Sequence, residues 1–195
     1  NITAGKNWAP FVRGDDLFFV HEYAPFRVLQ AAFLSPQDDF MVLNTVAKHR
    51  ISTPKSADKF SQFRGGANAV EIEGKIVGVG HRNAAIGDTI VHRPFIFIYD
   101  PDVSVTYYDF NYDFPKDYNI VDPTSLYLKD GVLYLVTSET EQVWDIVPQS
   151  GRACLYTIEL EGLFNEDSTC VGGRRLYRWA NGETSQIRRF LGAWR

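Results

Sequence analysis

The chain is a succession of short segments in which hydrophobic and polar side chains alternate. Three pairs of segments share one plan: a hydrophobic segment, a tight turn rich in Gly and Asp, a second hydrophobic segment and a polar cluster. They are APFVRGDDLFFVHE (9–22), NAVEIEGKIVGVGHR (68–82) and PTSLYLKDGVLYLVTSE (123–139). Alternation with period two is typical of strands, and Gly, Asp and Asn tolerate the positive φ of hairpin turns. The pattern therefore predicts three β-hairpins.

The hairpins belong to a longer repeat, because the turn glycines Gly14, Gly74 and Gly131 recur at intervals of about 60 residues. A third hydrophobic segment follows each hairpin, starting at Phe26, Arg93 and Gly151. More polar fourth segments start at Asp39 and Ser104, and the third unit has a weaker candidate within 170–179. Four antiparallel strands per repeat are typical of the blades of a β-propeller, whereas a β-sandwich is the alternative with similar alternation.

We therefore predict an all-β chain that forms a partial β-propeller of about three four-stranded antiparallel blades. The blades are expected at about 6–50, 60–114 and 119–162, within a propeller region spanning 1–165. The tail, 166–195, is expected to be a C-terminal extension or part of a fourth blade. Closed propellers typically have four to eight blades, so we expect a partner chain or a missing remainder to complete the ring.

Composition limits the function classes. The 195 residues are 45% hydrophobic and 14% aromatic, which is typical of a globular protein and favours strands. A net charge of −4 argues against a broad basic face for nucleic acid, and no apolar run reaches the ~20 residues of a membrane helix. The start at Asn1 without Met, together with an N-glycosylation sequon there, favours a processed, secreted chain or part of a longer one. Cys154 and Cys170 pair in a disulfide or are two buried thiols, without metal-ligand spacing around them.

Four segments, in order, resemble a known superfamily. They are KNWAPFVRGDDLFFVHEYAPFRVL (6–29), FRGGANAVEIEGKIVGVGHRN (63–83), HRPFIFIYD (92–100) and DPTSLYLKDGVLYL (122–135). They are similar to blade segments of five-bladed carbohydrate-active propellers, the superfamily of β-fructosidases, arabinanases, β-mannoside phosphorylases and glycosyltransferase-like relatives. The resemblance covers about residues 6–160 and implies a sugar or sugar-phosphate ligand bound in a funnel at one end of the propeller axis.

In the hydrolases of that superfamily, acidic residues on the inner strands of successive blades act on the glycosidic bond. At the corresponding positions this chain has Asn7 and Trp8 in the first blade and Arg64 and Asn68 in the second, whereas the third has Asp122. The hydrolytic triad is therefore not recognisable. The candidate catalytic residues are Asp122, Glu22 and Glu139, the last two at the ends of second strands.

Hairpin geometry predicts a basic rim, because the start of a hairpin's first strand lies beside the end of its second. The rim is expected to hold Arg27, Arg64, His81, Arg82, His92 and Arg93, with Asp122 beside it. Such a cluster suits a phosphate or carboxylate, and Asn7 and Trp8 complete the expected ligand-binding set. Structural ion pairs are the alternative for each basic residue, and core packing is the alternative for Trp8.

Two functions follow from these expectations. One is a glycosyltransferase or glycoside phosphorylase or hydrolase that uses the basic rim for phosphate and a carboxylate for proton transfer. The other is a non-catalytic propeller module that binds glycan or serves as a structural subunit of a larger assembly. No cofactor or metal is predicted by the sequence in either case.

Overall fold

The computed structural model describes residues 7–32, 35, 41–50, 62–86, 89–110, 119–140, 151–160, 170–171 and 173–180. Side chains are not described for 62, 84–86, 109 and 170–180. Strands dominate these residues, and the sheets are built mainly from antiparallel pairs. The prediction of an all-β chain is confirmed. No helix among the described residues is long and apolar enough to cross a membrane.

The first unit is a four-stranded antiparallel sheet in the order β1-β2-β3-β4. Its strands are β1 (Ala9–Arg13), β2 (Asp16–Tyr23), β3 (Phe26–Ala32) and β4 (Val42–His49). The order follows the chain, so each strand is joined to its neighbour by a direct connection. This is the up-and-down arrangement that the repeat predicts.

The second unit begins with two short strands, β5 (Gln62–Arg64) and β6 (Ala69–Ile72), which pair with the same long strand, β7 (Lys75–Ile86). They act together as one first strand interrupted at 65–68. Next come β8 (Thr89–Tyr99) and β9 (Val105–Phe110), each antiparallel to the strand before it. The third strand starts at Thr89, four residues before the predicted Arg93, because the hairpin continues beyond its hydrophobic part.

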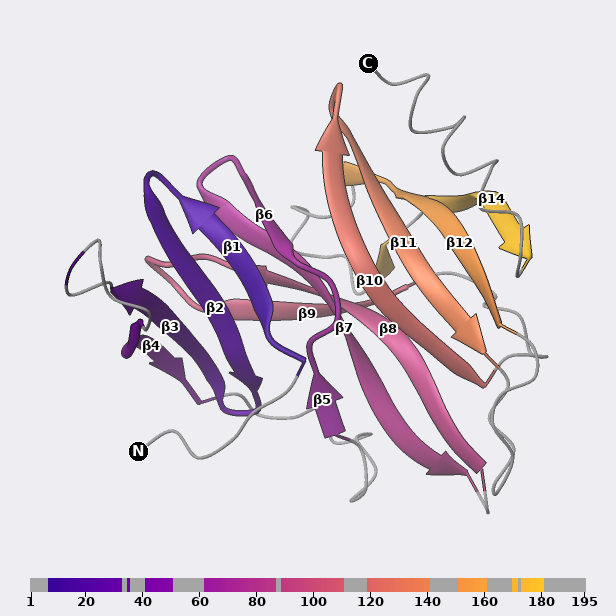
Figure 1. Ribbon diagram of the computed structural model, residues 1–195, viewed down its shortest axis with the longest axis horizontal. Coiled ribbons are helices and arrows are strands. Elements are labelled where there is room, and N and C mark those ends of the chain that lie inside the picture. The colour runs from indigo at the N-terminus through magenta and orange to yellow at the C-terminus, as the bar shows by residue number, and fades with distance from the viewer. Residues whose placement is uncertain are drawn as a thin grey trace.

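The third unit consists of β10 (Ile120–Lys129), β11 (Val132–Thr140), β12 (Gly151–Ile158) and β14 (Gly173–Ala180). Successive strands pair antiparallel, and β14 forms the outer edge beside β12. The segment beyond residue 166 thus supplies a strand to this unit. The short β13 (Cys170–Val171) runs parallel to β9, and one parallel contact between Ile120 and His92 joins the second and third units. Figure 1 shows the three units side by side, with the second in the middle.

The three predicted hairpins are present. Their ladders close at Arg13–Asp16, Ile72–Lys75 and Lys129–Val132, each around a two-residue turn. In the second and third hairpins both turn residues have positive φ, at Glu73–Gly74 and Asp130–Gly131. This is the backbone geometry whose twist matches that of the flanking strands.

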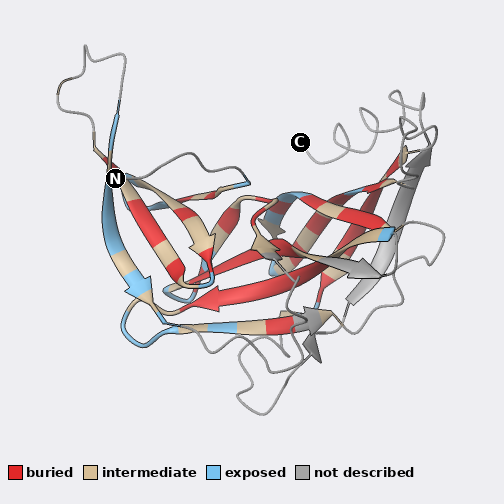
Figure 2. Ribbon diagram, turned by 90° about the horizontal axis from the view of Figure 1, so that it is seen from below, coloured by how far each residue is buried: buried red, intermediate tan, exposed pale blue. Residues whose placement is uncertain are grey.

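The second unit is buried on both faces (Figure 2). One face packs on the third unit through a cluster that includes Val77, Val79, Ile96, Leu133 and Leu135. Its other face packs on the first unit through a cluster that includes Val20, Phe26, Ile76, Phe95 and Phe97. A strand covered on both sides is hydrophobic at nearly every position, which explains the unbroken run from Ile76 to Gly80 and from Pro94 to Tyr99.

Polar side chains also join neighbouring units. The amide of Asn68 donates to the carbonyl of Leu126 at 2.9 Å and accepts from the N–H of Leu126 at 2.9 Å, as a backbone segment would. The hydroxyl of Tyr107 donates to the carbonyl of Tyr23 at 2.5 Å. These bonds join the second unit to the third and the first unit to the second, in addition to the hydrophobic clusters.

Candidate functional site

Two glycines bring the three units together at one end. A Cβ on Gly65 would lie 1.9 Å from the carbonyl oxygen of Asn7, and a Cβ on Gly66 would lie 2.6 Å from Pro123. The interruption between β5 and β6 is therefore held between the start of the first unit and the start of the third. Only glycine allows so close an approach of backbones. This places Asn7, Arg64 and Asp122 at the same end of the assembly.

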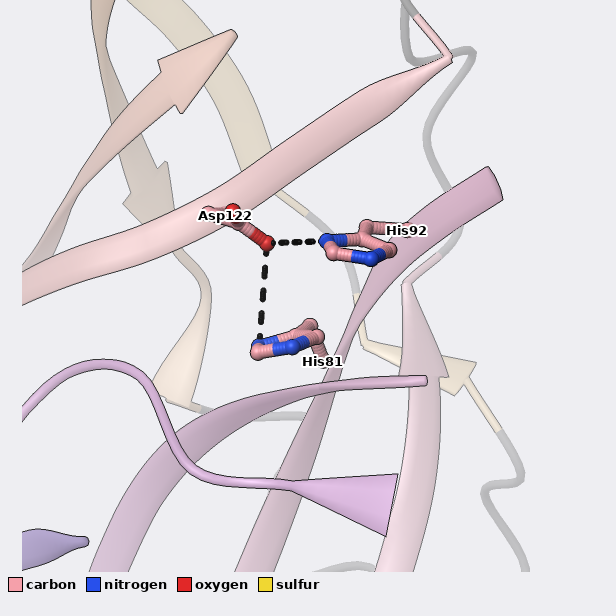
Figure 3. A group of neighbouring side chains, drawn as sticks. All are labelled: His81, His92 and Asp122. Atoms are coloured by element: carbon pink, nitrogen blue, oxygen red, sulfur yellow. Dashed lines mark hydrogen bonds and ion pairs between the residues drawn. The ribbon is translucent and has the colours of Figure 1, made fainter. Parts of the chain in front are cut away.

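The centre of this end is Asp122 of β10, which lies against two histidines of the second unit (Figure 3). Its Oδ1 atom is 2.7 Å from Nδ1 of His92 and 3.7 Å from Nδ1 of His81. The two imidazole rings are stacked, with centroids 4.8 Å apart and an interplanar angle of 21°. In the Nδ1-protonated tautomer, His92 donates a hydrogen bond to the carboxylate.

The three side chains differ in their contact with solvent. Asp122 is 37% exposed, His92 is 18% exposed and His81 is 2% exposed. The Nδ1 atom of His81 is buried and has no hydrogen-bond partner. Buried polar atoms normally have a hydrogen-bond partner, so the unpaired Nδ1 atom of His81 is unusual in a folded protein.

The pKa of His81 is lowered to about 4, mainly by burial, and the charges of His92 and Arg64 act in the same direction. The carboxylate of Asp122 and a hydrogen bond to the backbone of Gly65 act in the opposite direction, but burial is the larger effect. His81 is therefore neutral near pH 7, and its ring nitrogen is available as an acceptor or a metal ligand.

The arginines of the predicted rim do not all lie on the same face of the sheet. Arg64 is the cross-strand partner of His81, as hairpin geometry predicts, and its positive charge helps to lower the pKa of His81. Arg82 pairs with Phe63 and Arg93, so strand alternation directs it to the opposite face from His81. Arg93 donates from Nη1 to the carbonyls of His92 and Asn119, both at 2.9 Å. Burial lowers its pKa, although Glu139 opposes this.

Glu139 of β11 lies in a closed hydrogen-bond network. It is 0% exposed and accepts from Nε of Arg152 at 2.7 Å, from the hydroxyl of Tyr156 and from the hydroxyl of Thr137 at 3.3 Å. Both oxygens are thus occupied by protein donors. A buried carboxylate whose oxygens are all bonded within the protein is typical of a residue that stabilises the fold.

The candidates of the first unit form a separate group. Glu22 makes an ion pair with Arg27 at 3.1 Å between Oε2 and Nη2, and His21 lies 3.7 Å away from its Oε1. Trp8 packs edge-on against His21 and Phe19, which gives it a packing role. Asn7 has a positive φ of 63° where it meets Gly65. In this structure neither Glu22 nor Arg27 joins the Asp122 cluster.

Sequence reasoning placed Asp122 beside the histidines but missed the network around Glu139. Arg152, Tyr156 and Thr137 were not singled out, because the contact depends on the register of β11 with β12, which pairs Glu139 with Arg152. The sequence does contain a signal for this contact, because Glu139 lies at the end of one expected strand and Arg152 lies at the start of the next. Cys154, for which the sequence allows a disulfide or a buried thiol, is fully buried.

A pocket of about 300 Å³ lies at the other end of β7 and β8. It is bordered by Phe11 and Phe18 of the first unit and by Ile76 and Tyr99 of the second, with Arg13 at its edge. Ile76 and Tyr99 are direct ladder partners, five positions before His81 and seven positions after His92, so this pocket is separate from the Asp122 cluster.

No family model matches the chain, and no curated protein matches it in sequence. Solved structures do match. The GH32 β-fructofuranosidase BmSUC1 of Bombyx mori superposes with a TM-score of 0.50 at 13% identity, and an aspartate-to-alanine mutant of it in complex with sucrose does so with a TM-score of 0.50 at 12% identity. Each match covers 86% of this chain.

The likeness is one of fold. It confirms, at the level of the fold, the similarity to part of a β-fructofuranosidase propeller that the sequence motifs indicated. The chain spans 33% of the length of the silkworm enzyme in either match, so the similarity is to part of the propeller. The β-sandwich alternative is not favoured by these matches.

Proposed function

We propose that this chain is part of a carbohydrate-binding propeller and that its ligand is a sugar or sugar phosphate held at the Asp122 end. The three units are the blades, at about 6–50, 60–114 and 119–162, and β14 (Gly173–Ala180), beyond these bounds, is the outer strand of the third. A five-bladed ring needs further blades, from a longer chain or from a partner. The observation that carries the proposal is the convergence of the three first strands on a half-exposed carboxylate flanked by two histidines.

Each residue has a role in this proposal. Asp122 accepts hydrogen bonds from sugar hydroxyls, and with His92 it forms a pair able to take up and return a proton. Arg64 supplies positive charge for a phosphate or carboxylate on the ligand, because its guanidinium presents several donors in one plane. The silkworm relative was solved with sucrose, which supports a sugar as the ligand class.

A two-carboxylate glycosidase mechanism is not part of the proposal. Such a mechanism needs one carboxylic acid to protonate the leaving oxygen and a second carboxylate as base or nucleophile. Of the three candidate acids, Glu139 accepts hydrogen bonds from Arg152 and Tyr156. Glu22 forms an ion pair with Arg27. Asp122 alone combines an exposed side chain with the convergent strand ends.

Titration calorimetry with a sugar phosphate, the corresponding neutral sugar and inorganic phosphate tests the proposal. The sugar phosphate is expected to bind. Arg64→Gln is expected to weaken its binding about 10-fold, the loss of one charge-assisted hydrogen bond, and to leave neutral-sugar binding unchanged. Asp122→Asn is expected to weaken both. Arg13→Gln is the matched control, since Arg13 pairs with Glu71 away from the cluster.

Failure of all sugars to bind, or equal losses in Arg13→Gln and Arg64→Gln, would contradict the proposal. The same proteins decide between transfer chemistry and binding alone. Release of phosphate from a glycosyl phosphate by the native chain, but not by Asp122→Asn, supports a phosphorylase or transferase. Binding without any release, in both proteins, supports a non-catalytic module.

A further inference from the structure

His81, His92 and Asp122 offer three potential metal ligands. Their ligand atoms, one from each side chain, all lie within 4.8 Å of one another. They come from β7, β8 and β10, so no spacing in the sequence reveals them. Two imidazoles and one carboxylate form a donor set used for Zn²⁺ in catalytic sites, where a fourth position stays open for water or substrate.

From this arrangement we propose that His81, His92 and Asp122 bind one divalent transition-metal ion, Zn²⁺ in the first instance. The proposal goes beyond sugar binding and does not depend on it. Its independent support is the Nδ1 atom of His81, which lies on a side chain only 2% exposed, points toward Asp122 and has no hydrogen-bond partner. A metal ion supplies the missing partner.

The distances set the movements that an ion requires. Ligand atoms about 2.1 Å from a tetrahedral Zn²⁺ lie about 3.4 Å apart. The His92–Asp122 distance of 2.7 Å opens by about 0.7 Å, and the His81–Asp122 distance of 3.7 Å closes by about 0.3 Å. The ligand atoms of the two histidines, within 4.8 Å of each other, close by up to about 1.4 Å. On binding, the proton on Nδ1 of His92 moves through solvent to Nε2, so that Nδ1 ligates the metal ion and the imidazole stays neutral.

Neighbouring groups affect the affinity of this site for a metal ion in both directions. The exposed side of Asp122 leaves an entry path and an open coordination position. Arg93, which donates to the carbonyl of His92, steadies the backbone behind one ligand. The charge of Arg64 reaches His81 and therefore lowers the affinity for a cation.

The experiment uses the whole chain without a histidine tag, stripped with a chelator and titrated with Zn²⁺ in a calorimeter and with Co²⁺ in an absorption spectrometer. We expect one ion per chain and the visible absorption bands of four-coordinate Co²⁺. His81→Gln, His92→Gln and Asp122→Asn should each weaken Zn²⁺ binding by more than about 100-fold, the upper limit for loss of an outer-shell partner.

Two variants control for folding and for unspecific binding. His49→Gln removes a histidine on β4 that packs against Phe26 and Tyr99, away from the cluster, and should bind Zn²⁺ as the native chain does. Arg64→Gln should bind Zn²⁺ more tightly by a few fold, a gain that a misfolded protein does not give.

Absence of the Co²⁺ bands, a cobalt–thiolate absorption band, or equal losses in His49→Gln and His81→Gln would overturn the metal proposal. Sugar-phosphate binding is measured separately with and without chelator. Zn²⁺ binding without sugar binding contradicts the proposed function alone, and sugar binding without Zn²⁺ binding contradicts the metal site alone.

Discussion

Two carboxylates on neighbouring strands of the third unit have opposite surroundings. Glu139 on β11 is buried, and its oxygens accept from Arg152, Tyr156 and Thr137. Asp122 on β10 is 37% exposed, with one histidine at hydrogen-bond distance and another just beyond it. The first group has used its hydrogen-bonding capacity within the protein, and the second has not.

The strand register explains the difference. Asp122 pairs with Ser138 and the next position of β11, Glu139, pairs with Val121, so the two carboxylates lie on opposite faces of the hairpin. On the other side of β11, Glu139 meets Arg152 directly, and Thr137 meets Cys154, with Tyr156 farther along the same face. The hydrogen-bond network around Glu139, in which both carboxylate oxygens have protein donors, holds neighbouring strands together. The carboxylate of Asp122 still has the capacity to accept hydrogen bonds from a ligand.

The largest effect is expected from Glu139→Gln. Loss of the carboxylate charge leaves the buried guanidinium of Arg152 uncompensated, and breaking a buried ion pair in this way costs about 3–5 kcal/mol in the free energy of unfolding. Asp122→Asn should cost less than about 1 kcal/mol, because its side chain is 37% exposed and solvent screens its interaction with the histidines. Urea denaturation measures both. Equal losses would erase the distinction between the two carboxylates.

The next effect is the pH dependence of stability that His81 contributes. Its pKa is about 4 in the folded chain and 6.5 in the unfolded chain, so the unfolded chain binds more protons between these values. Its contribution is complete above pH 6.5 and is lost as the pH falls toward 4, by about 3 kcal/mol at 1.36 kcal/mol per pKa unit.

Denaturation between pH 4 and 7 checks this sign and size. His81→Gln should flatten the dependence, whereas His49→Gln should keep it. A smaller dependence in the same direction remains, since burial also lowers the pKa of His21. If His81→Gln and the native chain show the same slope, His81 is not held neutral by its surroundings.

The smallest effect tests the contact that holds the open cluster in place. Gly66→Ala introduces a Cβ 2.6 Å from Pro123, next to Asp122, so β10 or the 65–68 segment must move. Overpacking of this kind costs about 1–3 kcal/mol, and the shift should weaken ligand binding as well. Gly14→Asn is the control: its turn has open space and a φ of +61° that Asn tolerates. Unchanged binding in Gly66→Ala would show that the cluster does not depend on this contact.

The sequence by itself determined the strands, the hairpins and the repeat. Alternation, the Glu73–Gly74 and Asp130–Gly131 turns and the spacing of the glycines are local signals, and local backbone physics is enough to interpret them. The pairing of Arg64 with His81 was also predictable, because a hairpin fixes which residues face each other. The motifs that resemble carbohydrate-active propellers led to the fold that the solved structures confirm.

Only the tertiary structure decided which of the candidate residues act together. The meeting of His81 and His92 with Asp122 depends on how the second unit packs against the third, and that packing is set by side chains distant in the sequence. The same holds for Glu139, which forms a buried ion pair because the register of β11 with β12 places Arg152 opposite it. Which atoms a charged group faces, and how much water reaches it, are properties of the folded chain and cannot be read from local sequence.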